Sequence, residues 1–138
     1  ELMNETGATR RLGLEEWAAT QPEHRLVCHL IVPAKPGRVV SKRYANTMES
    51  LSYLVVSLCL PDVAARVALT VKGVGAFVSP ELSDAASRGA GEDELVELAY
   101  GLDATIPSDM YGSERYKRYL AGVTLARMLE DAGRDDAR

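Results

Sequence analysis

The chain has 138 residues, of which 46% are hydrophobic and 26% charged, a mixture typical of one globular domain. Its net charge of −4 at pH 7 argues against a nucleic-acid-binding protein, because such a protein needs a basic surface to displace counterions from phosphates. The longest apolar run, near residues 54–60, is far shorter than the roughly 20 residues that cross a bilayer. No basic segment followed by an apolar one marks export, so we expect a cytoplasmic protein without a membrane span.

The first half of the chain reads as a series of strands. Residues 25–32 are rich in β-branched and apolar residues and end at Pro33, which cannot continue a ladder. Three further strands are expected at 38–44, 51–60 and 66–72, the last of which alternates as a half-buried strand does. The connections between them are short, and parallel neighbours need long crossovers, so the pattern favours an antiparallel sheet.

The second half reads as helices. Ser79 as N-cap and Pro80 in the first turn predict a helix that stops near residues 89–91. The carboxylates of residues 92–94 suit the positive end of a second helix, which Gly101 ends.

A long final helix is expected to open at Gly112 and Ser113. Its apolar positions fall at helical spacing: Tyr116, Tyr119, Leu120 and Val123. The two tyrosines are interpreted as packed core or interface rings, with Lys117 and Arg118 solvated; the alternative is a basic face that binds a phosphate or a partner's carboxylate. The whole pattern predicts an α+β fold, in which an antiparallel sheet of three to four strands is followed by about three helices packed on one face.

The two cysteines, Cys28 and Cys59, lie in strand-like apolar runs without the spacing of a metal knuckle or a redox pair. We expect buried thiols in a reducing compartment; the alternative, a disulfide between neighbouring strands, requires an oxidising environment. Adjacent side chains of a strand point to opposite faces, so Cys28 and His29 are not expected to act as nucleophile and base. With only His24 and His29 as imidazole ligands and no carboxylate cluster beside them, no metal site is predicted.

Two further motifs have a structural reading that we prefer. The run Gly73-Val74-Gly75 lacks the third glycine, the following helix and the lysine of a phosphate-binding loop, so a turn or bulge at the end of a strand is expected. Ser113 has no evident base and is interpreted as an N-cap. No catalytic residue is therefore predicted.

A small capping residue, a tyrosine, two basic residues, a second ring and an apolar run follow one another in residues 113–129. This order resembles the closing helix of the flavoprotein subunit of molybdenum hydroxylases, the family of carbon monoxide dehydrogenase and xanthine dehydrogenase. Upstream features resemble the family in the same order: the acidic-aromatic segment 12–17, a strand ending at Val32-Pro33, Lys42, Ser50, the strand 54–60, and residues 67–74. The resemblance spans residues 12–132, although Lys72 stands where the family usually has a glycine and Tyr119 where it often has a histidine.

The resemblance implies a C-terminal domain that packs against an upstream FAD-binding domain and helps to shape the isoalloxazine pocket. In that family electrons pass from a molybdenum centre through iron–sulfur clusters to FAD and then to an acceptor, so the molybdenum and iron–sulfur subunits are the implied partners. Lys42 matches a family lysine beside the flavin, where a cation stabilises the reduced, anionic ring; the alternative is a solvated strand lysine. Asn46 stands in place of a family arginine, and Glu49 matches an acidic residue. By itself the chain is expected to lack activity and to bind FAD poorly.

Three regions are expected: a flexible end of a preceding region at 1–11, a single α+β domain at 12–132, and a charged, disordered tail at 133–138. A hypothesis from another class is a stand-alone interaction or dimerisation module with the same fold, whose apolar sheet or tyrosine-rich helix forms a symmetric interface. The presence of a flavin domain distinguishes the two hypotheses. An electron-transfer domain needs an attached or co-expressed flavin domain, whereas a dimerisation module does not. An independent small hydrolase has the least support, since no nucleophile, base and orienting group assemble from the sequence.

Overall fold

The computed structural model describes the chain except residues 5, 14–15, 18–25, 33–36, 61–63 and 137–138. The chain divides into two compact units, residues 1–35 and residues 36–138. The division falls within the region 12–132 that the sequence predicts as one domain, so each unit is described by itself.

The first unit contains a small antiparallel sheet. Its strands β1 (Leu2–Met3), β2 (Thr9–Arg10) and β3 (Leu26–Val27) lie in the order β2-β1-β3. The turn after β1 is closed by the side chain of Asn4, whose Oδ1 accepts a hydrogen bond from the backbone N–H of Ala8 at 2.9 Å. The antiparallel register pairs Leu2 with Val27 and Met3 with Leu26, so residues after Val27 lie beyond the start of β1. Residues 28–32 of the strand predicted at 25–32 are accordingly irregular.

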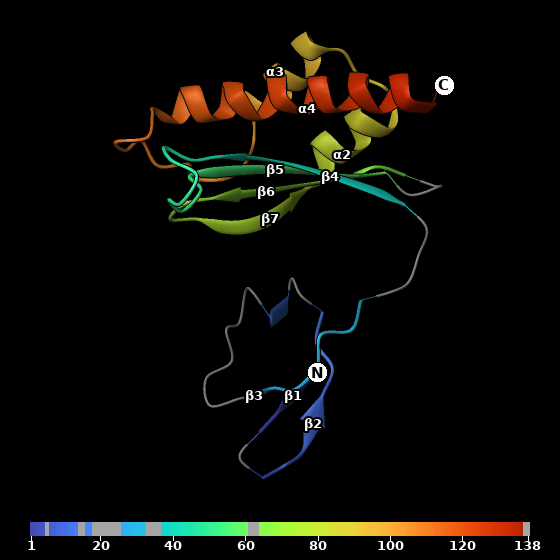
Figure 1. The fold of residues 1–138 in the computed structure, drawn as a ribbon, viewed down its shortest axis with the longest axis vertical. Coiled ribbons are helices and arrows are strands. Elements are labelled where there is room, and N and C mark those ends of the chain that lie inside the picture. The colour runs from blue at the N-terminus through green and yellow to red at the C-terminus, as the bar shows by residue number, and fades with distance from the viewer. Residues whose placement is uncertain (5, 14–15, 18–25, 33–36, 61–63, 137–138) are drawn as a thin grey trace. The chain divides into compact units, whose positions relative to one another are not determined.

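The second unit contains a four-stranded antiparallel sheet in the order β4-β5-β6-β7 (Figure 1). Its strands are β4 (Arg38–Tyr44), β5 (Leu54–Leu60), β6 (Arg66–Val71) and β7 (Gly75–Ser79). Side chains of β5 and β6 alternate in burial, and the inward set forms the sheet side of the core: Leu54, Val56, Leu58, Val67, Leu69 and Val71. The strands predicted at 38–44, 51–60 and 66–72 correspond to β4, β5 and β6.

The strand β7 was not predicted from the sequence. Gly73 and Gly75 have φ values of +85° and +103°, and the backbone N–H of Val74 bonds to the carbonyl of Val71 at 3.0 Å. This turn reverses the chain into a hairpin, so Gly75–Ser79 pairs with β6. The predicted turn at residues 73–75 is confirmed, and a strand rather than a helix follows it, unlike in a phosphate-binding loop.

Three helices follow the sheet and lie over one of its faces (Figure 1): α2 (Pro80–Ser87), α3 (Glu92–Tyr100) and α4 (Glu114–Asp136). The predicted N-caps are confirmed, since Ser79 Oγ accepts from Leu82 N at 3.2 Å and Ser113 Oγ accepts from Tyr116 N at 3.1 Å. The α+β class and the sheet-then-helix order are therefore as expected. None of the described helices combines the length and the apolarity that crossing a bilayer requires.

The final helix runs further than the sequence suggested. It continues to Asp136, into the segment 133–138 for which we predicted disorder. Arg134 lies 4.0 Å from the carboxylate of Glu130 and 3.8 Å from that of Asp131, spacings at which charges support a helix. The described part of this charged segment is therefore a helical end, on which Arg134 is exposed.

Helices α3 and α4 approach each other closely at Gly122. A Cβ placed on Gly122 would lie 2.6 Å from Val96 Cα and 2.9 Å from the carbonyl oxygen of Leu95. The backbones therefore touch where no side chain intervenes, with buried Ala99 and Leu125 in the same core. This contact fixes the position of α4 against the middle of α3.

Candidate functional site

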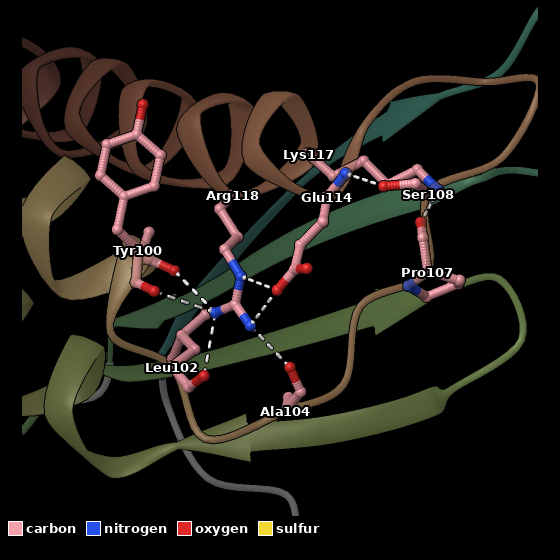
Figure 2. A network of polar contacts seen from close by, with 9 residues as sticks. Tyr100, Leu102, Ala104, Pro107, Ser108, Glu114, Lys117 and Arg118 are labelled. Atoms are coloured by element: carbon pink, nitrogen blue, oxygen red, sulfur yellow. Dashed lines mark hydrogen bonds and ion pairs between the residues drawn. The ribbon is translucent and has the colours of Figure 1, made fainter.

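The first two turns of α4 carry two basic side chains that are buried (Figure 2). Lys117 is 0% exposed and Arg118 is 8% exposed. Arg118 donates to four backbone carbonyls and to one carboxylate: Ala99 at 3.2 Å, Tyr100 at 3.3 Å, Leu102 at 2.9 Å, Ala104 at 2.7 Å, and Glu114 Oε1 at 2.8 Å. One guanidinium thus supplies donors to the C-terminal end of α3 and to the chain beyond it, where carbonyls have no helical partner.

Lys117 holds the segment that precedes α4. Its Nζ donates to the carbonyl of Pro107 at 2.6 Å and forms an ion pair with Asp109 Oδ1 at 2.8 Å. The hydrogen bond from Lys117 lowers the pKa of the Asp109 carboxyl below its ordinary value, and the backbone N–H of Tyr111 and the charge of Lys72 act in the same direction. The carboxylate is therefore kept charged beside the buried ammonium.

The expectation for this helix was wrong in its side-chain orientation. The sequence suggested solvated basic residues and packed rings, whereas Tyr116 is 46% and Tyr119 44% exposed while Lys117 and Arg118 lie inside. The helix turns its basic residues inward because the end of α3 and the chain after it gather carbonyls that need donors. The signal in the sequence was Gly101, which ends α3 and leaves those carbonyls unpaired, but which donor serves them depends on the tertiary fold.

Three tyrosine side chains gather where β4 ends and β5 begins, beside the segment that precedes α4. The rings of Tyr53 and Tyr111 stack at a centroid distance of 5.5 Å, and Tyr44 lies 6.4 Å from Tyr53. The Tyr44 hydroxyl is 2.6 Å from Thr124 Oγ1, and Lys72 Nζ donates to the Tyr111 hydroxyl at 2.8 Å. The phenols are thus tied to a helix and a lysine, and these contacts pair no nucleophile with a base.

Burial raises the pKa of the Tyr53 phenol, and the nearby hydroxyls of Tyr116 and Tyr44 raise it further. The phenol is therefore neutral at physiological pH and acts as a hydrogen-bonding group. This places the cluster among the structural contacts of the unit.

Lys42 lies in β4 opposite Val56 of β5, with an exposed side chain. Its ammonium has no hydrogen bond or ion pair to another described residue. The next residue, Arg43, points to the opposite face of the sheet, as successive strand residues do. Asn46 and Glu49 follow in the loop after β4 and are also exposed.

The loop after β4 is organised by Arg43. Its Nη2 donates to the carbonyls of Ser50 at 2.7 Å and Met48 at 2.8 Å, and more weakly to Thr47 at 3.4 Å. The loop lines an open hollow of about 510 Å³ whose walls include Arg43 and Asn46. Lys42 is not in that wall, so the structure does not bring it together with Asn46 around the hollow.

The cysteines are less buried than expected. Cys28 and Cys59 are free and only partly buried. His29 is exposed and lies outside β3, so the strand argument about Cys28 and His29 does not apply there. His24 lies outside the described residues. Within the described part of the chain, no three His, Cys, Asp or Glu side chains gather as a metal site.

Comparisons with models of protein families, with curated proteins and with solved structures find no match to this chain. Tyr116, Lys117 and Arg118 are among the residues that carry the resemblance, and their contacts show what they do in this structure. Lys117 and Arg118 are buried and donate to backbone carbonyls, so these two residues stabilise the fold.

Proposed function

We propose that this chain is the C-terminal domain of the flavoprotein subunit of a molybdenum hydroxylase. Such a domain supports an upstream FAD-binding domain and contributes to the flavin pocket, while electrons pass from molybdenum and iron–sulfur centres through FAD to an acceptor. The observation that carries the proposal is the order of features that resemble that family, closing with the helix that begins after Ser113. The sheet-then-helix arrangement of residues 38–136 is compatible with it.

The part of the site that can act on a flavin is Lys42. An exposed ammonium without a polar partner among the described residues is available to a ligand or to another domain. Beside an isoalloxazine, such a cation favours the reduced, anionic ring over the neutral oxidised one. Arg43 holds the adjoining loop, which contains Asn46 and Glu49, through the carbonyls of three other residues.

The test is the intact mass and the visible spectrum of the natural polypeptide that carries this sequence, purified from its source cells. The proposal expects a longer, yellow chain with flavin absorption bands. A colourless polypeptide of 138 residues contradicts it. Tight, stoichiometric FAD binding by the 138-residue chain also contradicts the division of labour proposed here.

A second candidate is a stand-alone interaction or dimerisation module. The observation that favours it is the exposure of Tyr116 and Tyr119 on α4, since tyrosine is enriched in protein interfaces. The same purification distinguishes the two, because the module is colourless and does not copurify with a flavoprotein.

A further inference from the structure

Three loops of the second unit meet at one end of its sheet (Figure 1). They are residues 45–53 between β4 and β5, residues 72–74 between β6 and β7, and the segment 107–113 before α4. The backbone N–H of Lys72 bonds to the carbonyl of Tyr53 at 3.1 Å, and the Tyr53 ring stacks on Tyr111. These contacts join the three loops into one surface.

This surface concentrates exposed apolar side chains. We define the loop end by four of them: Met48 at 94% exposure, Leu51 at 81%, Val74 at 41% and Met110 at 84%. The other large apolar residues of comparable exposure in the described part of residues 36–138 are Val39, Tyr116 and Tyr119. Of these, Tyr116 lies beside Gly112 and thus borders the loop end, whereas Val39 lies toward the other end of β4. A cluster of apolar side chains on loop tips marks an interaction surface more often than scattered single residues do.

The loops of the loop end are held in place by polar contacts. Thr47 and Ser50 exchange side-chain and backbone hydrogen bonds of 2.9 and 3.1 Å, in addition to the Arg43 bonds. Asp109 and Gly112 exchange two backbone hydrogen bonds of 3.1 Å. A surface that is already ordered loses little conformational entropy when it binds.

Charge around the loop end favours a second copy of the chain as the occupant. Glu49 and Asp109 lie in these loops together with Lys72 and the Arg43 that braces them, so both signs are present. An isologous interface requires a surface that complements itself, and a rim of mixed sign satisfies this where a rim of one sign repels its copy.

Three consecutive acidic residues of the second unit lie away from this surface. Glu92, Asp93 and Glu94 form the first turn of α3, where Glu94 pairs with Arg88 after α2. The residue before Arg88, Ser87, accepts a hydrogen bond from the backbone N–H of Ala65, which precedes the start of β6. This contact places the end of α2 at the end of the sheet opposite the loop end. Pairing two loop ends therefore keeps these three carboxylates away from the interface.

We propose that the loop end is a self-association surface, at which two copies of this chain dock about a two-fold axis. Methionine suits the role because its flexible, polarisable side chain adapts to an apolar partner. The inference does not depend on the flavin, since a domain of a larger flavoprotein and a stand-alone module can each associate in this way.

The first test uses the unsubstituted 138-residue chain with ¹³C-labelled methionine methyl groups, observed by NMR over a range of concentrations. Met48 and Met110 should shift with concentration, whereas buried Met128 should not. Sedimentation velocity on the same samples should show a monomer–dimer equilibrium. A monomer at every concentration, or a dimer whose formation leaves the Met48 and Met110 signals unmoved, overturns the proposal.

The second test compares substitutions at matched exposed sites. Met48→Asp and Met110→Asp should each raise the dimer dissociation constant by at least about tenfold, because the interface then has to desolvate a carboxylate. Val39→Asp is the control, since Val39 is 67% exposed and lies toward the other end of β4. An equal effect of Val39→Asp places the interface on the strand and overturns the proposal, with circular dichroism verifying the fold of each variant.

Discussion

Arg118 is the residue on which the contact between the end of α3 and the start of α4 depends. It bonds to carbonyls of four residues and is nearly buried, so its removal leaves several acceptors without a donor. We expect Arg118→Met to lower the free energy of unfolding by about 3 kcal/mol, because buried unpaired polar groups keep their full desolvation cost. Urea denaturation followed by circular dichroism measures this.

Arg115 provides the matched control for that substitution. It lies in the same helix turn with an exposed side chain, and its guanidinium carbon is 5.6 Å from the centroid of the Tyr100 ring. Arg115→Met should cost less than about 1 kcal/mol, the scale of an exposed cation–π contact. Equal losses for the two arginines would show that the carbonyl contacts contribute little.

The lowered pKa of Asp109 predicts how the free energy of unfolding changes with pH. The pKa of its carboxyl is lowered in the folded chain, first by the hydrogen bond from Lys117, so the folded state binds this proton less readily than the unfolded state. The resulting stabilisation is present above the ordinary carboxyl pKa and is lost as the pH falls through the lowered value. Asp109→Asn should therefore flatten the decline of unfolding free energy between about pH 5 and pH 2.

The control for this pH experiment is Asp103→Asn, which changes an exposed carboxylate in the same connection between α3 and α4. Urea titrations at several pH values should give Asp103→Asn the slope of the unsubstituted chain. The account of Asp109 fails if its asparagine variant keeps that slope as well.

Lys42 is the residue on which the proposed flavin chemistry can be tested. In the intact flavoprotein, Lys42→Met should make the two-electron potential of the flavin more negative by about 30 mV, which corresponds to about 1.4 kcal/mol of lost charge stabilisation. Lys42→Arg keeps the charge and should stay near the original potential. Spectroelectrochemical titration measures both, and equal potentials in all three proteins would assign Lys42 to solvent.

At the scale of the elements, the contact of α3 with α4 depends on a glycine. A methyl group on Gly122 would overlap Val96 Cα at 2.6 Å, and backbone cannot rotate away as a side chain does. Gly122→Ala should therefore destabilise the fold by about 1–3 kcal/mol, despite the better helix propensity of alanine.

Gly133 in the same helix is a site where alanine is expected to stabilise the fold instead. A Cβ at Gly133 meets no atom within 4 Å, so Gly133→Ala should raise stability by up to about 1 kcal/mol through helix propensity. Thermal unfolding of the two variants measures the difference. Destabilisation by both alanines would point to a helix effect unrelated to packing.

The elements that the sequence predicted well are those whose signals are local. An apolar run located β5 and an alternating pattern located β6, while Ser79 and Ser113 located two helix starts. The strand β7 escaped prediction because its residues pair only once the turn at Gly73 folds them back on β6. The inward Lys117 and Arg118 escaped it because their acceptors come from another helix and from the chain after it.

At the scale of the whole molecule, the large core cluster belongs to one of the two units. Its buried members run from Tyr53 to Met128, all within residues 36–138. We therefore expect residues 36–138 to fold when the first 35 residues are deleted, with less than about 1 kcal/mol of change in stability, since hydrophobic burial dominates folding. Circular dichroism and urea denaturation of the shortened chain provide the measurement.

A shortened chain that shows no cooperative unfolding transition in urea contradicts this expectation. That result would make the first unit part of the folding unit. The unshortened chain is the reference, and both should be compared at one protein concentration because self-association adds apparent stability.

The donors on α4 also affect the order in which the molecule can form during synthesis. The ribosome makes α4 after every strand and helix against which it packs, yet α4 supplies the ammonium and guanidinium that the chain after α3 requires. The sheet with α2 can assemble on the nascent chain, while the carbonyls at the end of α3 stay hydrated until Lys117 and Arg118 have left the exit tunnel. Truncation before α4 is therefore expected to yield a trapped intermediate rather than a smaller native protein.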